Sequence, residues 1–388
     1  MRRRLVTLIA TVLAVATLAA GCSDDETSDS SPTTDAAETS TTLDPMEAAR
    51  AYAEPGPHPV GVATLSLGKG PEVEVWYPAA EGTTGTVAYD VRDFAPPAIR
   101  DILTADIPAT FEVDGARDAA AAEDGPFPVV LFSHGFTGIR VQSSFLTAHL
   151  ASWGMVVVAP DHPSRDLFNV LGGTASGDRA DSVDDLLQAL DLITTEGTTA
   201  GSIFEGLVDP DRVAALGHSA GGGTVLGAAL DERVDGYVSM ASGGPEDPAD
   251  FPDRPSFFLA GSTDAVVPAV DRTRPAYDDA PAPSRYWEIA DVGHNGFDDF
   301  CTFGGGTGII GIAEASGLGP VLDAQPQLRT LGEDGCVEPA SPVDQAFPII
   351  RHGVTSWLRA LFGDDPGAVG LDGAVETAYD LDITVATK

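Results

Sequence analysis

Short apolar runs alternate with amphipathic stretches along the chain after residue 55, and this alternation predicts its fold class. Residues 128–132 form a continuous apolar run, as expected of a strand that is covered on both faces. In residues 181–194, one helical face carries Leu186, Leu187, Leu190 and Ile193. The pattern predicts strands at 60–67, 73–77, 128–132, 155–159, 213–216, 236–240, 256–260 and 286–289, and helices at 141–152, 181–194, 220–230 and 345–361. Such alternation indicates an α/β protein with a mostly parallel sheet, helices on both faces and a single domain.

The first 54 residues do not show this alternation of apolar runs and amphipathic stretches. Arg2, Arg3 and Arg4 precede an apolar run that ends at Gly21-Cys22, which is typical of a cleaved export signal. The run is too short to span a bilayer. The end of this segment resembles the lipobox of bacterial lipoproteins, in which the cysteine carries lipid. This resemblance predicts a signal peptide at 1–21, a lipidated Cys22 and a cell-surface protein tethered to the outer face of the cytoplasmic membrane; an ordinary secretion signal is the alternative.

Residues 22–54 are rich in Ser, Thr and acidic side chains, so we expect a disordered stalk and a folded domain at 55–388. The whole chain has 59 acidic against 21 basic residues and a formal net charge of −38. This acidity argues against nucleic acid as a partner, because binding phosphates requires basic patches. It also argues against docking on anionic lipid, so the membrane is expected as a partner only through the lipid anchor.

One motif carries most of the functional information. Gly217-His218-Ser219-Ala220-Gly221 is a G-x-S-x-G sequence between a predicted strand and a predicted helix. In this context the motif places a nucleophilic serine on a tight strand-to-helix turn. We therefore predict that Ser219 is a catalytic nucleophile.

A serine nucleophile needs a base to accept its proton and a carboxylate to orient that base. Asp264 and His294 each follow a predicted strand, in the expected order Ser, Asp, His, and we predict that they fill these roles. Glu246 or Asp247, after the preceding strand, is the alternative acid. The other histidines considered, at 134, 149, 218 and 352, are expected to have structural roles.

Acyl transfer also creates an oxyanion, which two fixed N–H groups must stabilise. The backbone N–H of Ala220 directly follows the nucleophile. The second donor is expected from the loop after the strand at 128–132, at the N–H of Phe136.

With these pieces, the chain resembles the α/β-hydrolase superfamily, and within it the platelet-activating-factor acetylhydrolase and dienelactone-hydrolase-like group. The resemblance is carried by these segments: Phe132-Ser133-His134-Gly135-Phe136, Ala159-Pro160-Asp161-His162-Pro163, Asp209 to Gly222, Asp264 and His294. It implies the fold and the triad more than the substrate. Dienelactone hydrolases use cysteine where this chain has Ser219. Related polyester hydrolases often have Met and Trp where this chain has Ala220 and Ala241-Ser242-Gly243.

Two long connections, at about 84–126 and 301–342, interrupt the pattern and could border the site. Cys301 and Cys336 flank most of the second; in an exported protein they should form a disulfide that leaves Cys22 for lipid. The sequence Gly306 to Gly311 matches G-x-G-x-x-G, but it follows no clear strand and is expected to be a glycine-rich loop or the entry of a helix. No zinc-type Cys/His spacing and no Walker loop occurs, so neither a metal nor another cofactor is expected.

The sequence thus predicts a serine esterase that acts through an acyl-enzyme on small to medium esters. The alternatives are a lipase- or polyesterase-like hydrolase of bulkier esters, and a non-catalytic binding lipoprotein on a hydrolase scaffold.

Overall fold

The computed structural model describes residues 43–104 and 106–388. The predicted signal, Cys22 and the stalk up to residue 42 lie outside this part of the chain. The folded unit begins at Leu43, earlier than the expected boundary at 55. Helix α1 (Pro45–Ala48) and the residues after it pack on the domain, with Ala49 and Tyr52 buried. The physical reason is contact with distant parts of the chain, because His149 and His352 bond the backbone of Tyr52.

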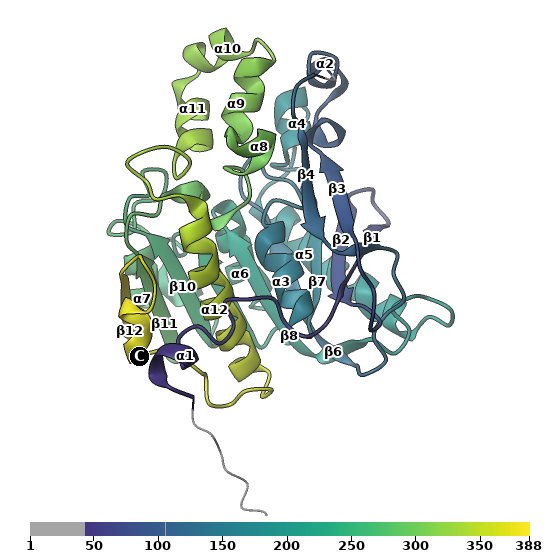
Figure 1. Ribbon diagram of the computed structural model, residues 1–388, viewed down its shortest axis with the longest axis vertical. Coiled ribbons are helices and arrows are strands. Elements are labelled where there is room, and N and C mark those ends of the chain that lie inside the picture. Colours follow the sequence, from purple (N-terminus) through teal and green to yellow (C-terminus); the bar gives the residue numbers. More distant parts are fainter. Residues whose placement is uncertain (1–42, 105) are drawn as a thin grey trace, which may run out of the picture. The chain divides into compact units, whose positions relative to one another are not determined.

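A ten-stranded sheet forms the centre of the domain, in the order β12-β11-β10-β9-β8-β6-β7-β2-β1-β5 (Figure 1). Its six middle strands are parallel: β7 (Val156–Pro160), β6 (Phe127–Ser133), β8 (Val208–His218), β9 (Gly236–Met240), β10 (Ser256–Gly261) and β11 (Ser284–Ile289). The outer strands are β2 (Glu72–Pro78), β1 (Val60–Ser66), β5 (Ala116–Arg117) and β12 (Ile383–Thr387). Strands β1 and β2 pair antiparallel, as the sequence predicts.

Two apolar cores lie on opposite faces of the sheet because successive strand residues point to opposite sides. Val130 and Phe132 of β6 belong to one core, and Val129 and Leu131 belong to the other. Helices α3 (Ser144–Ser152) and α12 (Val343–Leu361) cover the first face. Helices α5 (Arg179–Thr198), α6 (Ala220–Ala228) and α7 (Thr273–Asp279) cover the second. The predicted α/β class with helices on both faces is therefore confirmed.

The sequence pattern missed the edge strand β12, which pairs antiparallel with β11. Its apolar residues are few, because an edge strand is only partly covered; Ile383 is buried and Val385 is half-buried. The predicted helix at 141–152 begins three residues later, at Ser144.

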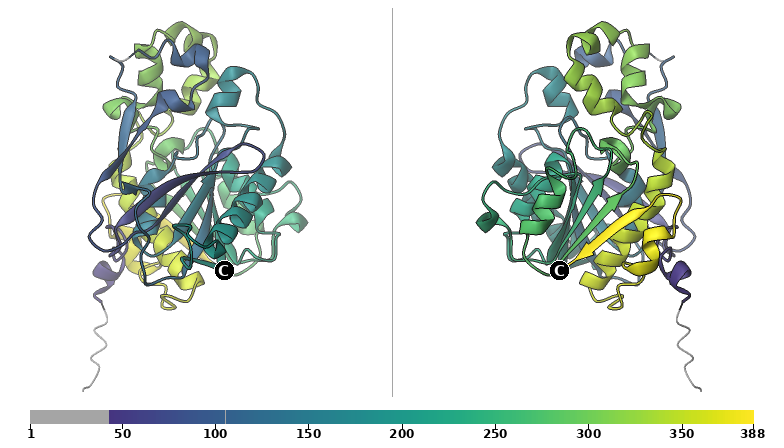
Figure 2. Two further views of the ribbon diagram at one scale, coloured as in Figure 1. Left: turned by 90° about the vertical axis from the view of Figure 1, so that its right-hand side faces the viewer. Right: turned by 90° about the vertical axis from the view of Figure 1, so that its left-hand side faces the viewer.

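The helices of both long connections lie at the end of the sheet where the parallel strands terminate (Figures 1 and 2). The first contains β3 (Thr86–Asp90), η1 (Val91–Phe94), α2 (Pro97–Arg100) and β4 (Thr110–Asp114). The second, which we call the roof segment (residues 301–342), contains α8 (Phe303–Gly306), α9 (Gly308–Ala315), α10 (Gly319–Ala324) and α11 (Pro326–Glu333). A shorter helix, α4 (Leu167–Gly172), follows β7. The remaining short helices are η2 (Pro248–Asp250), η3 (His294–Phe297) and η4 (Gly373–Thr377).

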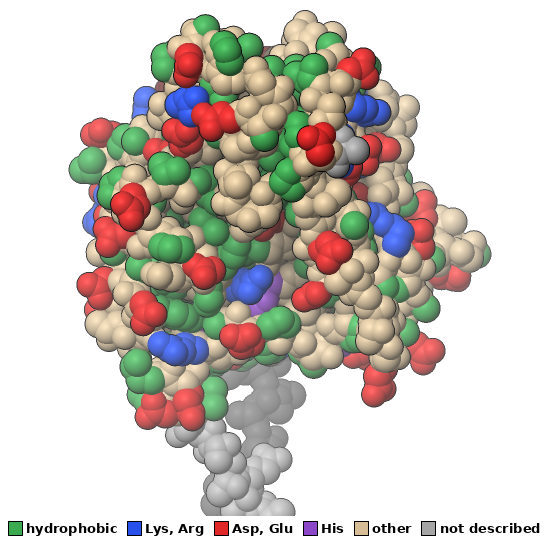
Figure 3. Space-filling model, turned by 45° about the horizontal axis from the view of Figure 1, so that its top comes forward, with side chains coloured by type: hydrophobic (Ala, Val, Ile, Leu, Met, Phe, Trp, Pro, Cys, Tyr) green, Lys and Arg blue, Asp and Glu red, His purple; other side chains and the backbone are tan. Residues whose placement is uncertain are grey.

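The described residues contain no helix that is both long and apolar enough to cross a membrane. Acidic side chains are spread over the face drawn in Figure 3, and basic ones are few.

Candidate active site

Ser219 lies on the turn between β8 and α6, in a backbone conformation that side chains rarely adopt (φ 56°, ψ −122°). Two glycines make this turn possible. A Cβ atom at Gly217 would lie 2.3 Å from the carbonyl oxygen of Gly221, and one at Gly221 would lie 1.9 Å from that of Ser133. Strain at a single non-glycine residue persists only where the surroundings impose it, and here it holds the Ser219 side chain at the end of the sheet.

The structure brings Ser219, His294 and Asp264 into one hydrogen-bonded chain. The Nε2 atom of His294 lies 2.9 Å from Oγ of Ser219, and its Nδ1 atom lies 2.9 Å from Oδ2 of Asp264. A carboxylate can only accept at Nδ1, so Nδ1 carries the proton and Nε2 accepts from the Ser219 hydroxyl. His294 and Asp264 are buried, which shields the pair from competing water.

The acid is itself held in place by its own loop. Oδ1 of Asp264 accepts hydrogen bonds from the backbone N–H groups of Val266 and Val267, at 2.9 and 2.6 Å. Its other oxygen therefore faces His294. The alternative acids Glu246 and Asp247 are exposed, and Asp247 instead accepts from the N–H of Ala249 in η2.

Two other buried histidines, His149 and His352, have partners away from Ser219, as their sequence context suggested. His149 and His352 both bond the backbone of Tyr52, at 2.9 and 3.2 Å, and so fasten the segment that precedes β1. Burial lowers the pKa of His149 to about 3 and that of His352 to about 4, so both are neutral.

Of the two expected oxyanion donors, Phe136 lines the same cavity as Ser219, and Ala220 directly follows Ser219 in the chain. Phe136 lies in the loop after β6, and Ala220 is the first residue of α6. Among the described residues, neither backbone N–H donates a hydrogen bond to a protein acceptor. Both N–H groups are thus available to an oxygen atom bound beside Ser219.

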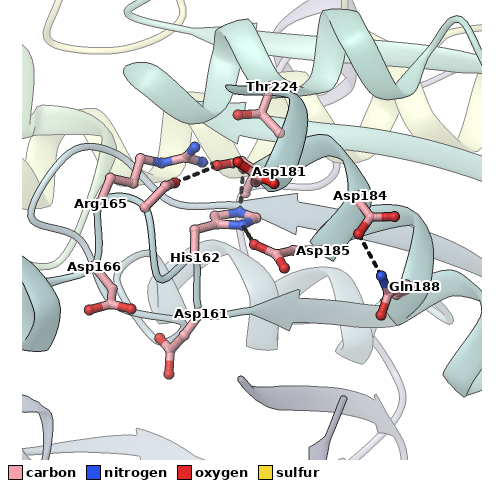
Figure 4. A network of polar contacts seen from close by, with 12 residues as sticks. Asp161, His162, Arg165, Asp166, Asp181, Asp184, Asp185, Gln188 and Thr224 are labelled. Carbon is pink, nitrogen blue, oxygen red and sulfur yellow. Dashed lines mark hydrogen bonds and ion pairs between the residues drawn. The ribbon is translucent and has the colours of Figure 1, made fainter. Parts of the chain in front are cut away.

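Figure 4 shows a buried polar network that includes His162, Arg165 and Asp185. His162 and Arg165 both contact the Ser133 hydroxyl, at 2.9 and 2.8 Å, and Arg165 also donates to the carbonyl of His134. The second ring nitrogen of His162 lies 3.1 Å from Asp185, which also pairs with Lys69. This network fixes the end of β6. His162 appears in the sequence only within a segment that carries the resemblance. No sequence pattern indicates Arg165, in the same loop after β7, or Asp185, on α5.

Gln142 and His218 connect the oxyanion loop to the base. The Gln142 side-chain oxygen accepts from the N–H of Gly135 at 3.0 Å, so its amide nitrogen donates to Nδ1 of His218 at 2.7 Å. Nε2 of His218 therefore carries the proton and donates to the carbonyl of His294 at 3.1 Å. Burial, reinforced by neighbouring His294, lowers the pKa of His218 well below its usual value and keeps the ring neutral. No sequence pattern indicates Gln142, because its role depends on contact with His218, which lies 76 residues further along the chain.

Asp334, at the end of α11 in the roof segment, joins the loops of the base and the acid. Its Oδ1 accepts from the N–H of His294 at 2.6 Å, and its Oδ2 accepts from the N–H of Ala265 at 2.8 Å. Its carbonyl oxygen accepts from the N–H of Asn295 at 2.8 Å. The adjacent Cys336 forms a disulfide with Cys301, so the roof segment is closed at its base.

The cavity above Ser219 has a volume of about 190 Å³ and is walled by both long connections and α4. A larger cavity, of about 440 Å³, lies between β4, α3 and α12 but contains none of the three side chains. The glycine motif at 306–311 follows α8 and enters α9, with no strand before it. The described residues contain no cluster of ligands suited to a metal ion.

The fold and site define the class of this protein, the α/β-hydrolase superfamily. The family description "PET hydrolase-like" matches residues 119–314, half of the chain, and the protein belongs to this family. The description "Platelet-activating factor acetylhydrolase, isoform II" matches residues 67–170. The chain lacks the Met and Trp noted above for polyester hydrolases, since it has Ala220 and Ala241-Ser242-Gly243 at those places.

Several curated proteins are similar over part of their length. Esterase YjfP of Escherichia coli is 36% identical over 107 residues, covering 27% of this chain and 41% of that protein. The bis(hydroxyethyl) terephthalate hydrolase of Streptomyces coelicolor is 27% identical over 177 residues, covering 45% and 52%. Cutinase est1 of Thermobifida alba is 25% identical over 188 residues, covering 44% and 55%. The chain therefore spans about half the length of the curated relatives that it matches.

A solved structure of a ferulic acid esterase from Streptomyces cinnamoneus has the same fold. It aligns with a TM-score of 0.60 and 20% identity, over 87% of this chain and 99% of that one. At this identity the likeness concerns the fold alone.

Proposed function

We propose that this protein is a serine carboxylic-ester hydrolase that acts on small to medium esters. The observation that carries the proposal is the hydrogen-bonded chain from Ser219 through His294 to Asp264, beside two available N–H groups. The esterases and cutinases among its relatives support the reaction class.

In the proposed reaction, His294 accepts the proton of Ser219 as the oxygen attacks the ester carbonyl. The N–H groups of Phe136 and Ala220 stabilise the resulting oxyanion, and Asp264 stabilises the protonated ring. The intermediate then collapses: the C–O bond to the alcohol breaks, and His294 gives its proton to the leaving oxygen. A water molecule, deprotonated by His294, hydrolyses the acyl-enzyme by the same steps and releases the acid.

The test is to incubate the protein with a fluorophosphonate and with p-nitrophenyl acetate, butyrate and palmitate. We expect labelling and turnover, and loss of both in Ser219→Ala. Ser176→Ala, at an exposed serine outside the site, serves as the control and should behave as the wild type. Absence of both labelling and turnover in the wild type between pH 6 and 9 would overturn the proposal.

We also propose that Cys22 is the lipid-bearing residue of an exported, membrane-tethered protein. The other two cysteines of the chain pair with each other in the structure, which supports a separate role for Cys22. Cys22→Ala should move the protein from the membrane fraction to the soluble fraction. Retention in the membrane fraction would contradict the proposal.

A further inference from the structure

The cavity above Ser219 is polar at one end only. Its polar lining side chains, among them Gln142, His218, Ser219 and His294, come from the carboxyl ends of β6, β8 and β11 and from the residues that follow these strands. The lining side chains that come from the long connections and α4 are apolar, and they include Ile99, Leu103, Leu171, Ile309, Ala313 and Leu331. A bound molecule therefore meets hydrogen-bonding side chains only where the ester is cleaved.

The helices of the roof segment are built to present this apolar wall. In α9, Ile309, Ile312 and Ala313 recur at the spacing of one helical face, and all three line the cavity. In α11, Gly332 lets the helix pack closely on α9, because a Cβ there would lie 2.6 Å from the Ile310 side chain. The wall is thus a packed layer and not a set of isolated apolar residues.

Apolar side chains continue to the surface at the mouth of the cavity. Phe136, Leu171 and Val321 line it and are 47%, 41% and 46% exposed. Exposed apolar side chains that adjoin a cavity indicate a site for an apolar ligand. The volume, about 190 Å³, is below the range of roughly 300–1,000 Å³ found for pockets that hold drug-sized ligands. One slender group fits such a space better than a polymer chain or a two-tailed lipid.

We propose that this cavity binds an aliphatic arm of a monomeric ester and makes the protein selective for esters of medium chain length. The inference rests on the proposed function of Ser219. The arm can belong to the acid or to the alcohol half of the ester, since both meet at the scissile carbonyl. A polar group at the far end of the arm would be buried without a partner and is selected against.

The first experiment compares two series of substrates: p-nitrophenyl esters from acetate to octanoate, and acetate esters from methanol to octanol. We expect kcat/KM to rise in one series by about fourfold per added methylene, the equivalent of about 0.8 kcal/mol, until the cavity is filled. The series that rises identifies the half of the ester that enters the cavity. A flat or falling profile in both series would overturn the inference.

The second experiment fills the cavity. Ala313→Trp places a large ring on the lining face of α9, and Ala315→Trp places the same ring on its exposed face. We expect the ratio of kcat/KM for the octyl-length substrate to that for the shortest one to fall at least tenfold in Ala313→Trp only. Because each ratio is taken within one variant, a loss of folded protein cancels. Equal ratios in the two variants would contradict the inference.

The third experiment tests the apolar end and does not depend on catalysis. Ser219→Ala should show a higher Tm with methyl octanoate than without it, and a smaller rise with the monomethyl ester of octanedioic acid, whose far end is charged. The rise should disappear in the double variant with Ala313→Trp. An equal response to both ligands, or none to either, would overturn the inference. Failure of the proposed function would instead appear as an absence of acetate turnover and fluorophosphonate labelling in the wild type.

Discussion

The carboxyl ends of the parallel strands, which we call the sheet edge, carry Ser219, and they face the same cavity as the roof segment. The two regions are held in place by different means. At the sheet edge, strands that are buried on both faces fix the loops of Ser219, Asp264 and His294 through backbone pairing. The roof segment adds no strand to the sheet. It is fastened by the Cys301–Cys336 disulfide and by the hydrogen bonds of Asp334. The sheet edge thus supplies the three side chains proposed for catalysis, and the roof segment supplies the apolar wall and the hydrogen bonds that join the loops of His294 and Asp264.

The largest effect should come from the acid at the sheet edge. Asp264→Asn should lower kcat by roughly 10⁴-fold, because an amide in place of the carboxylate stabilises the wrong tautomer of His294. Asp247→Asn is the matched control, since this carboxylate is exposed and follows the neighbouring strand β9. Steady-state kinetics with p-nitrophenyl acetate measure both. A larger loss in Asp247→Asn than in Asp264→Asn would assign the acid to the other loop.

A smaller effect on activity should come from the roof segment. Asp334→Ala removes the acceptor of the His294 and Ala265 N–H groups, and the resulting displacement should cost up to roughly 10²-fold in kcat. KM for the acetate ester should change little, because Asp334 does not line the cavity.

Asp323→Ala, at an exposed carboxylate of the same segment, is the control for this change. Asp334→Asn keeps one acceptor oxygen and should recover part of the activity. If Asp334→Ala retains the full kcat, the roof segment is a cover only and not a clamp.

The disulfide should affect stability more than chemistry. The bridge joins positions 35 residues apart. In the double variant Cys301→Ser and Cys336→Ser, its loss should lower the free energy of unfolding by about 3–4 kcal/mol in the chain-entropy model. Denaturant unfolding followed by circular dichroism measures the change. Cys22→Ser leaves this bridge intact and should unfold at the wild-type midpoint. An unchanged midpoint in the double variant would show that packing alone holds the roof segment.

The smallest effect should appear in the pH dependence of stability, and it should arise away from the roof segment, which contains no histidine. Burial lowers the pKa of His352 to about 4, so the folded state keeps this ring neutral while the unfolded state protonates it near pH 6.5. The neutral ring contributes on the order of 3 kcal/mol to the free energy of unfolding. This contribution is complete above pH 6.5 and is lost as the pH falls toward 4. His352→Gln should therefore flatten the fall in Tm between pH 7 and pH 4. An unchanged fall in Tm in His352→Gln would contradict this account.

The site could be predicted from sequence where local chemistry demands particular residues. Only glycine fits at positions 217 and 221 of the turn, so the position of Ser219 is visible in the sequence. Asp264 and His294 were predictable because the carboxyl ends of parallel strands lie at the same edge of a sheet. Gln142, Arg165 and Asp334 were not, because their importance lies in contacts between segments distant in the chain. The boundary near residue 55 was wrong for the same reason, since Tyr52 is held by His149 and His352.

The sequence by itself determined the α/β class, the strand-to-helix turn at Ser219 and the two cysteines available to pair. These depend on hydrophobic periodicity and on the steric limits of single residues, which are local properties. The tertiary structure decided that Asp334 joins the loops of His294 and Ala265 and that Ile309, Ala313 and Leu331 face Ser219 across one cavity. Such contacts depend on how helices of the two long connections pack against the sheet. That packing follows from the complementarity of distant surfaces, which no local pattern records.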